Sequence, residues 1–244
     1  SRRTMRTRVT LQLLAAVITA MVLSALVPAS AAGLGVSSRT LLAFHDPAAI
    51  TAPPIVTCDN FAKPSAKGNQ LAGRPVQMPA RCGTQTWQAN TGTWKITGGR
   101  LDSTGTNATA TLEAGSPSAT VEASFSNAQL SGRIGGVLVA HTGGSAPRYL
   151  AAALAGPNGV QLRLSDGSTV TTIATSTASY GSTSRLRLTY TAGTAQVAVG
   201  GVVVLTAVLT PAQRTLLTGT RAGLYDTQGS VKFDDVLITE AWLL

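Results

Sequence analysis

Apolar and polar residues alternate in short segments between residues 93 and 238, and turn-forming residues separate these segments. The alternation is clearest in residues 93–97, 121–126, 161–164, 185–190, 197–208 and 231–238. A period of two residues places alternate side chains on opposite faces of an extended chain, so each segment predicts a β-strand. The sequences Asp166-Gly167 and Gly200-Gly201 are typical of hairpin turns. We expect roughly ten to twelve strands.

Together these strands predict an all-β fold, an antiparallel two-sheet β-sandwich of the jelly-roll type. Ala151–Leu154 is predicted to be a short strand rather than a helix, because Tyr149 and Gly156 flank it. Apart from the N-terminal segment, one helix is predicted at Pro211–Leu217. It would begin at Thr210-Pro211, which suits the N-cap and the first helical position.

The first 32 residues combine the three parts of a secretory signal peptide. Four arginines precede an apolar run at residues 11–27, and small residues follow at 28–33. We therefore expect a hydrophobic signal helix within residues 1–32, contact with the membrane only before cleavage, and a secreted protein, extracellular or at the cell surface. A permanent membrane anchor is the alternative, although no basic cluster follows the run.

Residues 33–57 are predicted to form an extended arm ahead of a sandwich domain at residues 58–244. Apolar side chains alternate within residues 34–44, which indicates one strand. Pro47, Pro53 and Pro54 then interrupt regular structure. Such an arm can add a strand to its own sheet or to the edge of a neighbouring molecule, so self-association through residues 33–57 is one expected interaction.

Composition narrows the class of protein. The chain is 44% hydrophobic and only 12% charged, which excludes a disordered chain. Its net charge is +9, but residues 1–32 hold four arginines and no acid, so the remaining chain has 15 basic and 10 acidic residues. These cations are spread thinly along the sequence, which argues against a nucleic-acid partner and is compatible with a mild attraction to anionic polysaccharide.

Cys58 and Cys82 are the only cysteines in the chain. An exported protein folds where disulfides persist, and an even number of cysteines favours a bridge between this pair. Two buried free thiols are the alternative. The spacing is not the Cys-x-x-Cys of a thiol-redox site.

The order of the segments resembles the concanavalin A-like lectin/glucanase superfamily, in its laminin-G-like branch. The resemblance rests on an ordered series that includes Cys58-Asp59-Asn60-Phe61, TGTWKITGGRL (91–101), GVQLRLSDG (159–167) and VKFDDVLIT (231–239). It implies two curved antiparallel sheets and a concave face that often binds carbohydrate. The same fold serves lectins, enzymes and spacer modules, so function has to be argued from a site.

The sequence does not predict an enzyme. Glycosidases of this superfamily share a strand with a pattern similar to Glu-x-Asp-x-x-Glu. A glycosidase needs two carboxyl groups, one on each side of the glycosidic bond that it cleaves. Here Glu113 and Glu122 fall on separate predicted strands, and the adjacent Asp234-Asp235 would face opposite sides of one strand. His141 is expected to be a surface loop residue beside Gly143-Gly144.

Candidate ligand-binding residues are polar positions opposite the predicted core leucines. Arg163, Arg185 and Arg187 would share one sheet face, and three neighbouring cations favour an acidic or hydroxyl-rich glycan. The alternative is a solvated convex face. The resemblance implies further contacts at the end of the 137–154 hairpin and at the end of another strand. These additional candidates are His141, Arg148, Tyr149 and Tyr225. Trp87 and Trp94 are expected to pack in the core or at its rim.

No cofactor is required, but the resemblance implies that a structural calcium ion can be bound. The positions that match those of relatives are Asp59 and Asp235, or Asp234 in place of the latter. The alternative is that these side chains accept hydrogen bonds in turns and caps. The sequence thus predicts a secreted, non-catalytic module that binds polysaccharide or glycan. A structural or interaction module of an extracellular assembly is the second hypothesis, and a glycoside-active enzyme is the third.

Overall fold

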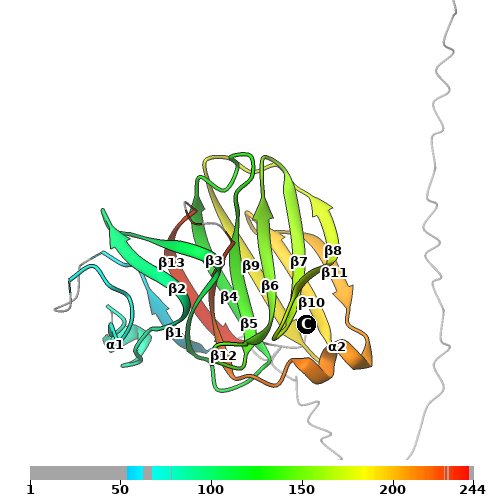
Figure 1. Ribbon diagram of the computed structural model, residues 1–244, viewed down its shortest axis with the longest axis horizontal. Helices are drawn as coiled ribbons and strands as arrows, with labels where there is room; N and C mark the ends of the chain where they lie inside the picture. Colours follow the sequence, from blue (N-terminus) through cyan, green and yellow to red (C-terminus); the bar gives the residue numbers. More distant parts are fainter. Residues whose placement is uncertain (1–53, 63–67, 78, 228, 230, 242–244) are drawn as a thin grey trace, which may run out of the picture. The chain divides into compact units, whose positions relative to one another are not determined.

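The structure is a computed structural model that describes residues 54–62, 68–77, 79–227, 229 and 231–241. The predicted signal helix and residues 33–53 of the predicted arm lie outside these ranges. Within them the chain forms thirteen strands and two short helices (Figure 1). No helix of the described part is long and apolar enough to cross a membrane.

The elements follow one another along the chain, and most strands after β2 are joined by short connections. The strands and helices are β1 (Ile55–Asp59), α1 (Pro79–Cys82), β2 (Gln88–Thr97), β3 (Arg100–Glu113), β4 (Ala119–Ser126), β5 (Ile134–His141), β6 (Arg148–Ala155), β7 (Gly159–Asp166), β8 (Val170–Thr177), β9 (Thr183–Thr191), β10 (Thr194–Val199), β11 (Val202–Val208), α2 (Pro211–Leu216), β12 (Arg221–Asp226) and β13 (Lys232–Glu240).

The strands form two antiparallel layers, which confirms the predicted β-sandwich. The first sheet has the order β11-β10-β9-β4-β13, with β1 also paired to β13. The second has the order β3-β12-β5-β6-β7-β8, with β2 paired to β3. The layers are joined where Phe233 of β13 pairs with Leu101 of β3. Near the opposite edges, the Ser176 hydroxyl of β8 donates to the Val204 carbonyl of β11 at 2.7 Å.

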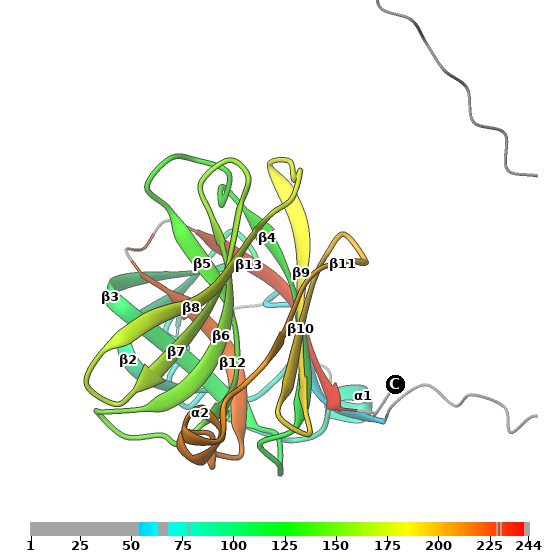
Figure 2. The same cartoon turned by 90° about the vertical axis from the view of Figure 1, so that its right-hand side faces the viewer.

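The core lies between the sheets and contains the alternating apolar residues. Leu150, Ala152 and Leu154 of β6 belong to it, together with Leu186 and Leu188 of β9, and all five are fully buried. Trp87 and Trp94 are buried as well, so the expectation that they pack in the core is confirmed. Figure 2 shows β9, β10 and β11 on one side of this core and β5, β6 and β7 on the other.

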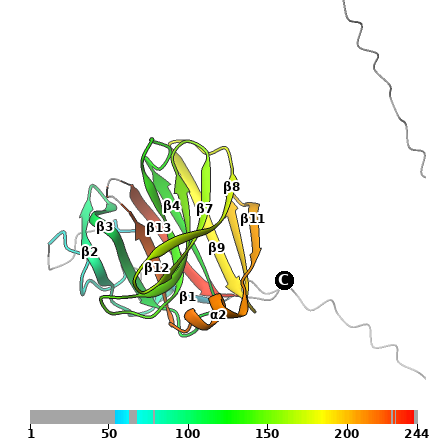
Figure 3. The same ribbon diagram turned by 45° about the vertical axis from the view of Figure 1, so that its right-hand side comes forward.

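The second sheet is curved. In Figure 2 the β2–β3 and β7–β8 hairpins bend away from the first sheet on either side of β5 and β6, and Figure 3 shows the β7–β8 hairpin from an intermediate angle. The side of the second sheet that faces away from the core is therefore its concave side. We call this side the outer face.

Two local predictions follow from turn and cap chemistry and are confirmed. The Asp166 carboxylate accepts hydrogen bonds from the backbone N–H groups of Ser168 and Thr169, each at 2.8 Å, in the β7–β8 turn. These bonds hold the pKa of Asp166 well below its usual range. Helix α2 has Thr210 as its N-cap and a capping box with Gln213.

The structure differs from the sequence-based expectation in three elements, one of which is the short helix α1, which was not predicted. Strand β8 was not predicted, because its threonine- and serine-rich sequence lacks a regular apolar alternation. Strand β1 begins at Ile55 and pairs with β13, so it crosses the boundary predicted at residue 58. These two additions account for a strand count above the expected one, and β1 is the part of the predicted arm that the structure describes.

Candidate functional site

Four of the seven predicted ligand-binding residues lie together on the outer face of the second sheet. We call the side chains of His141, Tyr149, Arg163 and Tyr225 the outer cluster. They come from β5, β6, β7 and β12, which are neighbours in the order β12-β5-β6-β7. Tyr149 and Tyr225 belong to an apolar cluster that is separate from the core between the sheets. Arg148 precedes Tyr149 at the start of β6, where its side chain is exposed.

Strand register explains why residues far apart in the sequence meet here. Tyr225 pairs with Gly136 of β5, and Gly136 in turn pairs with Ala153 of β6. Arg163 pairs with Ala151 of β6. A Cβ atom added to Gly136 would lie 1.8 Å from the Ala152 carbonyl oxygen, so only glycine fits this position. Gly136, Ala151 and Ala153 are small, so two long side chains can meet over them. Leu138 of β5, which pairs with Ala151, packs in the same apolar cluster.

The rings of the outer cluster contact one another in series. The His141 and Tyr149 rings are stacked, with centroids 5.6 Å apart and planes inclined by 15°. The Tyr149 and Tyr225 centroids are 5.7 Å apart. The Arg163 guanidinium carbon lies 5.5 Å from the centroid of the Tyr225 ring, which is within the range of a cation–π contact.

Arg163 differs in its hydrogen bonding from Arg221, an arginine on β12 of the same sheet. Arg221 donates to the Thr111 hydroxyl at 2.8 Å and forms an ion pair with Glu113 at 3.3 Å. By contrast, the Nε and Nη1 atoms of Arg163 are buried and have no hydrogen-bond partner among the described residues. A buried donor without an acceptor is energetically costly, which makes Arg163 the unusual member of the cluster.

A chain of hydrogen bonds lies beside the rings. The Nδ1 atom of His141 accepts from the Gly143 N–H at 2.9 Å, so the ring proton resides on Nε2, which donates to the Thr109 hydroxyl at 3.2 Å. The Thr91 hydroxyl donates to the Asn107 carbonyl at 2.8 Å. The Thr91 hydroxyl has thus used its proton, so in the hydrogen bond between the two hydroxyl groups at 3.0 Å the Thr109 hydroxyl donates and the Thr91 hydroxyl accepts. Each hydroxyl of this chain has a defined direction.

Burial keeps the rings of the outer cluster uncharged near neutral pH. Burial, together with the nearby cation of Arg221, lowers the pKa of His141 to about 4. Burial raises the pKa of Tyr225 to about 12 despite the nearby Arg163 cation, and it also raises the pKa of Tyr149. The cluster therefore presents neutral rings, hydroxyl groups and the single positive charge of Arg163.

Two expectations about these residues are wrong. His141 is fully buried and ends β5, rather than lying in a surface loop, because the strand continues past the apolar run and the ring stacks on Tyr149. Arg163 does not share a sheet face with Arg185 and Arg187. The latter two lie on β9, which pairs with β4 and β10 in the first sheet.

Arg185 also has a compensating acid that the sequence pattern did not indicate. Its Nε atom lies 3.1 Å from the Glu122 carboxylate on the neighbouring strand β4. Arg187 pairs in register with Glu122. The three arginines are therefore not a group of mutually repelling cations.

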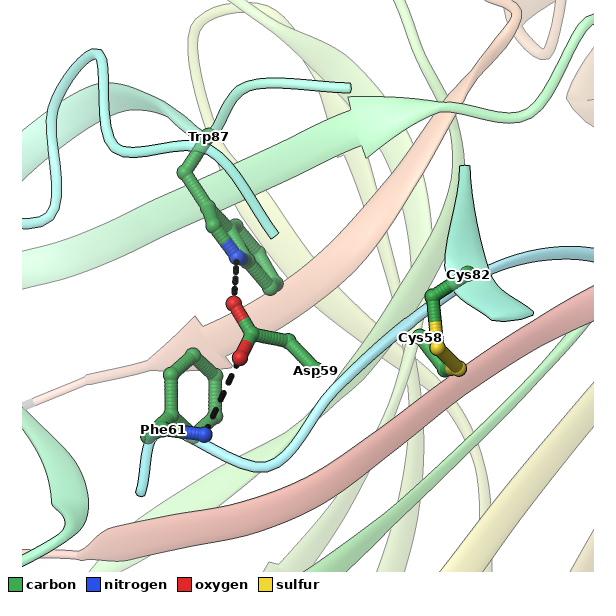
Figure 4. The surroundings of a disulfide bond; sticks show 5 residues. All are labelled: Cys58, Asp59, Phe61, Cys82 and Trp87. Carbon is green, nitrogen blue, oxygen red and sulfur yellow. Dashed lines mark hydrogen bonds between the residues drawn. A yellow bond between two sulfur atoms is a disulfide. The ribbon is translucent and has the colours of Figure 1, made fainter. Parts of the chain in front are cut away.

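The predicted calcium ligands lie in different settings. Figure 4 shows the Asp59 carboxylate accepting hydrogen bonds from the Phe61 N–H at 3.0 Å and the Trp87 indole N–H at 2.8 Å. The same carboxylate forms a buried ion pair with Arg74 at 2.5 Å. Asp235 is exposed and has a positive φ of 48°, at an irregular point of β13 where simple alternation of faces does not hold. Calcium binding stays a prediction.

The predicted disulfide is present. Cys58 and Cys82 are bonded, with their Cα atoms 4.8 Å apart, and the bridge ties β1 to α1 (Figure 4). The bridge lies next to Asp59, so covalent and ionic links hold the same end of β1.

The hydroxyl chain of Thr91, Asn107 and Thr109 was not identified from the sequence. A signal for it exists, because Thr109 and Thr111 alternate with Ala108, Ala110 and Leu112 in β3. This is the same period of two residues that identified the other strands. It was missed because threonine and alanine differ little in polarity.

Comparisons with known proteins agree on the fold. No family model matches the sequence, and no match was found among curated proteins. The chain is similar in structure to the carbohydrate-binding module CBM66 from Bacillus subtilis, with a TM-score of 0.52 and 14% identity over 63% of this chain and 95% of that one. A mutant of Trypanosoma rangeli sialidase displaying trans-sialidase activity also gives a TM-score of 0.52 and 14% identity, over 78% of this chain and 31% of that one. At such identities the similarity shows the fold alone.

Proposed function

We propose that this protein is an exported, non-catalytic carbohydrate-binding module that binds glycan with the outer cluster. The observation that carries the proposal is the arginine of this cluster, Arg163, which lies over an aromatic ring with two buried donors unpaired. Sugars are bound by aromatic faces and by polar groups that converge on them. Arg163 supplies a polar group on the concave side of one sheet, and the buried Tyr225 ring beneath it supplies an aromatic face when the guanidinium moves aside.

The fold and the cysteines support the proposal. The similar structure from Bacillus subtilis is named as a carbohydrate-binding module. The bond between Cys58 and Cys82 suits an extracellular or lumenal compartment, where disulfides persist. Residues 1–32 have the pattern of a signal peptide, which agrees with export.

The placement of the carboxylates favours binding over catalysis. Glu113 lies on β3 and Glu122 on β4, so they belong to different sheets, and each forms an ion pair with an arginine. Asp166 is engaged by its own turn. A glycosidase of the usual kind needs two carboxyl groups on either side of one bond, and these three do not flank a common position.

A glycan array probed with the exported protein tests this function. We expect binding to a limited set of glycans and several-fold weaker binding by Tyr225→Leu, which removes the aromatic face and keeps an apolar side chain. Arg185→Ser/Arg187→Ser, which alters the first sheet, is the matched control and should bind like the wild type. Absence of binding across the array, or equal binding by Tyr225→Leu, would refute the proposal.

A structural role in an extracellular assembly is the second candidate. It is favoured by β11, the last strand of the first sheet, which exposes Val202, Val203 and Val208. Exposed apolar residues on an edge strand are a common site of association. Sedimentation velocity over a range of concentrations would reveal such association. Val203→Lys should abolish it, whereas a wild type that remains monomeric would remove this candidate.

A further inference from the structure

We infer that the glycan carries a carboxylate, and that Arg163 binds this carboxylate by moving off the ring of Tyr225. This inference rests on the proposed function and narrows it to acidic polysaccharides. It depends on the charges around Arg163, on its unpaired donors and on the small residues beneath it.

Three acids of the second sheet are engaged with groups other than Arg163. Asp166, on the same strand, accepts hydrogen bonds from its own turn. Glu113 pairs with Arg221 at 3.3 Å. Asp226 follows Tyr225 on β12 and is fully buried, where it accepts a hydrogen bond from Ser103 at 2.9 Å. Among the described residues, no ion pair involves Arg163, so the outer cluster is left with one net positive charge.

The geometry of the guanidinium favours a carboxylate. Its planar fork of donors matches the two oxygens of a carboxylate, which it can bind through two parallel hydrogen bonds. At present its Nε and Nη1 atoms are buried without an acceptor, and the contact with the Tyr225 ring is the interaction that holds it. A bound carboxylate would restore the hydrogen bonds that these donors lost on folding. Its binding free energy should therefore be more favourable here than at a guanidinium that already has acceptors.

The surroundings allow Arg163 to move. On β6, Arg163 pairs with Ala151, and the outer-face positions on either side of Ala151 are Ala153 and Tyr149. The methyl groups of the two alanines offer little obstruction to rotation of Arg163 away from Tyr149. Departure of the guanidinium uncovers the Tyr225 ring, whose hydroxyl is held by a hydrogen bond to Asn107 at 2.9 Å. The ring would then be free to pack against the sugar that carries the bound carboxylate. Rotation of Arg163 would thus make both its charge and the Tyr225 ring available to the ligand.

The test compares acidic polysaccharides with neutralised forms of the same chains. Polygalacturonate, alginate and hyaluronan are each titrated into the full-length exported protein by calorimetry, alongside their methyl-esterified forms. We expect the acid forms to bind at least about tenfold more tightly, since a hydrogen bond to a charged group contributes that much or more. Added salt should reduce the difference.

Variants of Arg163 locate the effect. Arg163→Gln should bind acid and ester forms alike, and Arg163→Lys should recover part of the preference, because lysine keeps the charge without the fork. Arg185→Gln/Arg187→Gln should behave as the wild type. Far-ultraviolet circular dichroism of each variant checks folding, and the comparison of acid with ester in the wild type needs no variant.

The outcomes separate this inference from the proposed function. Equal binding of acid and ester forms by the wild type, or binding of neutral glycans only, would overturn the inference that the ligand carries a carboxylate. Either result would leave the proposed carbohydrate binding intact. Tighter binding of dextran sulfate than of every carboxylated chain would show that the site selects sulfate, which also overturns it. No binding to any polysaccharide would overturn both proposals. A preference for acid forms that persists in Arg163→Gln would remove Arg163 from the site.

Discussion

The imidazole Nδ1 atom of His141 accepts a hydrogen bond from the backbone N–H of Gly143, at 2.9 Å. A ring nitrogen that accepts cannot carry a proton, so the fold holds His141 in its neutral form. The other nitrogen donates to Thr109 at 3.2 Å. Protonation would place two donors against each other at Nδ1, and the segment after β5 would lose its link to the ring.

This arrangement predicts a loss of stability in mild acid. The unfolded chain binds a proton at His141 near pH 6.5, whereas the folded protein does so near pH 4, because of burial and, to a lesser extent, Arg221. Between these pH values the unfolded state binds more protons, so the free energy of unfolding falls as the pH falls. The contribution is fully present above pH 6.5, and about 3 kcal/mol of it is lost by pH 4. Denaturant unfolding at several pH values measures it.

His141→Asn is the matched variant for this prediction. The asparagine side-chain oxygen can accept from the Gly143 N–H but takes up no proton in this range. Its unfolding free energy should therefore fall less steeply than that of the wild type between pH 6.5 and pH 4. Equal slopes in the two proteins would show that other groups cause the acid sensitivity.

The strands could be predicted from the sequence because alternation is a local property. Leu186 and Leu188 in β9 and Leu162 in β7 show the same pattern, and all three face the core. The pattern does not say which sheet a strand joins, and this explains why Arg163 and Arg185 were placed on one face. Pairing of β9 with β4 and of β7 with β6 depends on contacts distant in the sequence.

Each member of the outer cluster was a candidate ligand-binding residue, but neither the grouping of the four residues nor their burial was predicted. Alternation predicts that a side chain opposite the core faces solvent. Tyr149 and Tyr225 are opposite the core and yet nearly inaccessible, because their rings pack on each other and Arg163 lies over Tyr225. Such packing requires a curved sheet and small neighbours, such as Gly136, whose positions depend on the register of three strands.

The disulfide is expected to stabilise the protein substantially. Cys58 and Cys82 are 24 positions apart, and closing a loop of this size contributes about 3 kcal/mol in the chain-entropy model. Cys58→Ala/Cys82→Ala should lower the free energy of unfolding by about this amount. Reduction of the wild type should have a similar effect in denaturant melts. If reduced and oxidised proteins unfold at the same denaturant concentration, the bridge contributes nothing.

Arg185 and Arg187 are expected to contribute little to stability. The Arg185 side chain is 54% exposed, and its ion pair with Glu122 lies at the surface. Arg185→Ser/Arg187→Ser should change the free energy of unfolding by less than about 1 kcal/mol. The sequence pattern alone predicts that this variant binds polysaccharide less well. With the proposed site on the opposite sheet, we expect unchanged binding, and weakened binding would move the site to β9.

Calcium is expected to have little effect on stability. An ion that binds only the folded state would raise the melting temperature with its concentration. The Asp59 carboxylate is already paired with the Arg74 cation, which an ion would have to displace. We therefore expect equal melting temperatures in EDTA and in excess calcium. A rise with calcium that disappears in Asp59→Asn would establish the site implied by the family resemblance.

The ion pair between Asp59 and Arg74 should be important for folding. Both side chains are fully buried, and the carboxylate also binds Trp87 and the backbone of Phe61. Asp59→Asn keeps the shape but removes the negative charge, so the Arg74 charge stays buried without its compensating acid. Loss of one partner of a buried pair costs about 3–5 kcal/mol. Chemical denaturation should show a decrease of this size.

A double-mutant cycle separates the ion pair from the packing of the individual side chains. Arg74→Met removes the cation while keeping most of the side-chain volume. If the cost of Asp59→Asn arises from an uncompensated charge, that cost should shrink when Arg74 is already methionine, and the two changes should not be additive. Additive effects would mean that Asp59 acts through its bonds to Trp87 and Phe61 alone.

The ion pair between Asp59 and Arg74 and the disulfide of Cys58 hold the same end of β1. The pairing of β1 with β13 should therefore weaken in Asp59→Asn and in Arg74→Met. Hydrogen exchange of the backbone at residues 57–59 would detect this weakening.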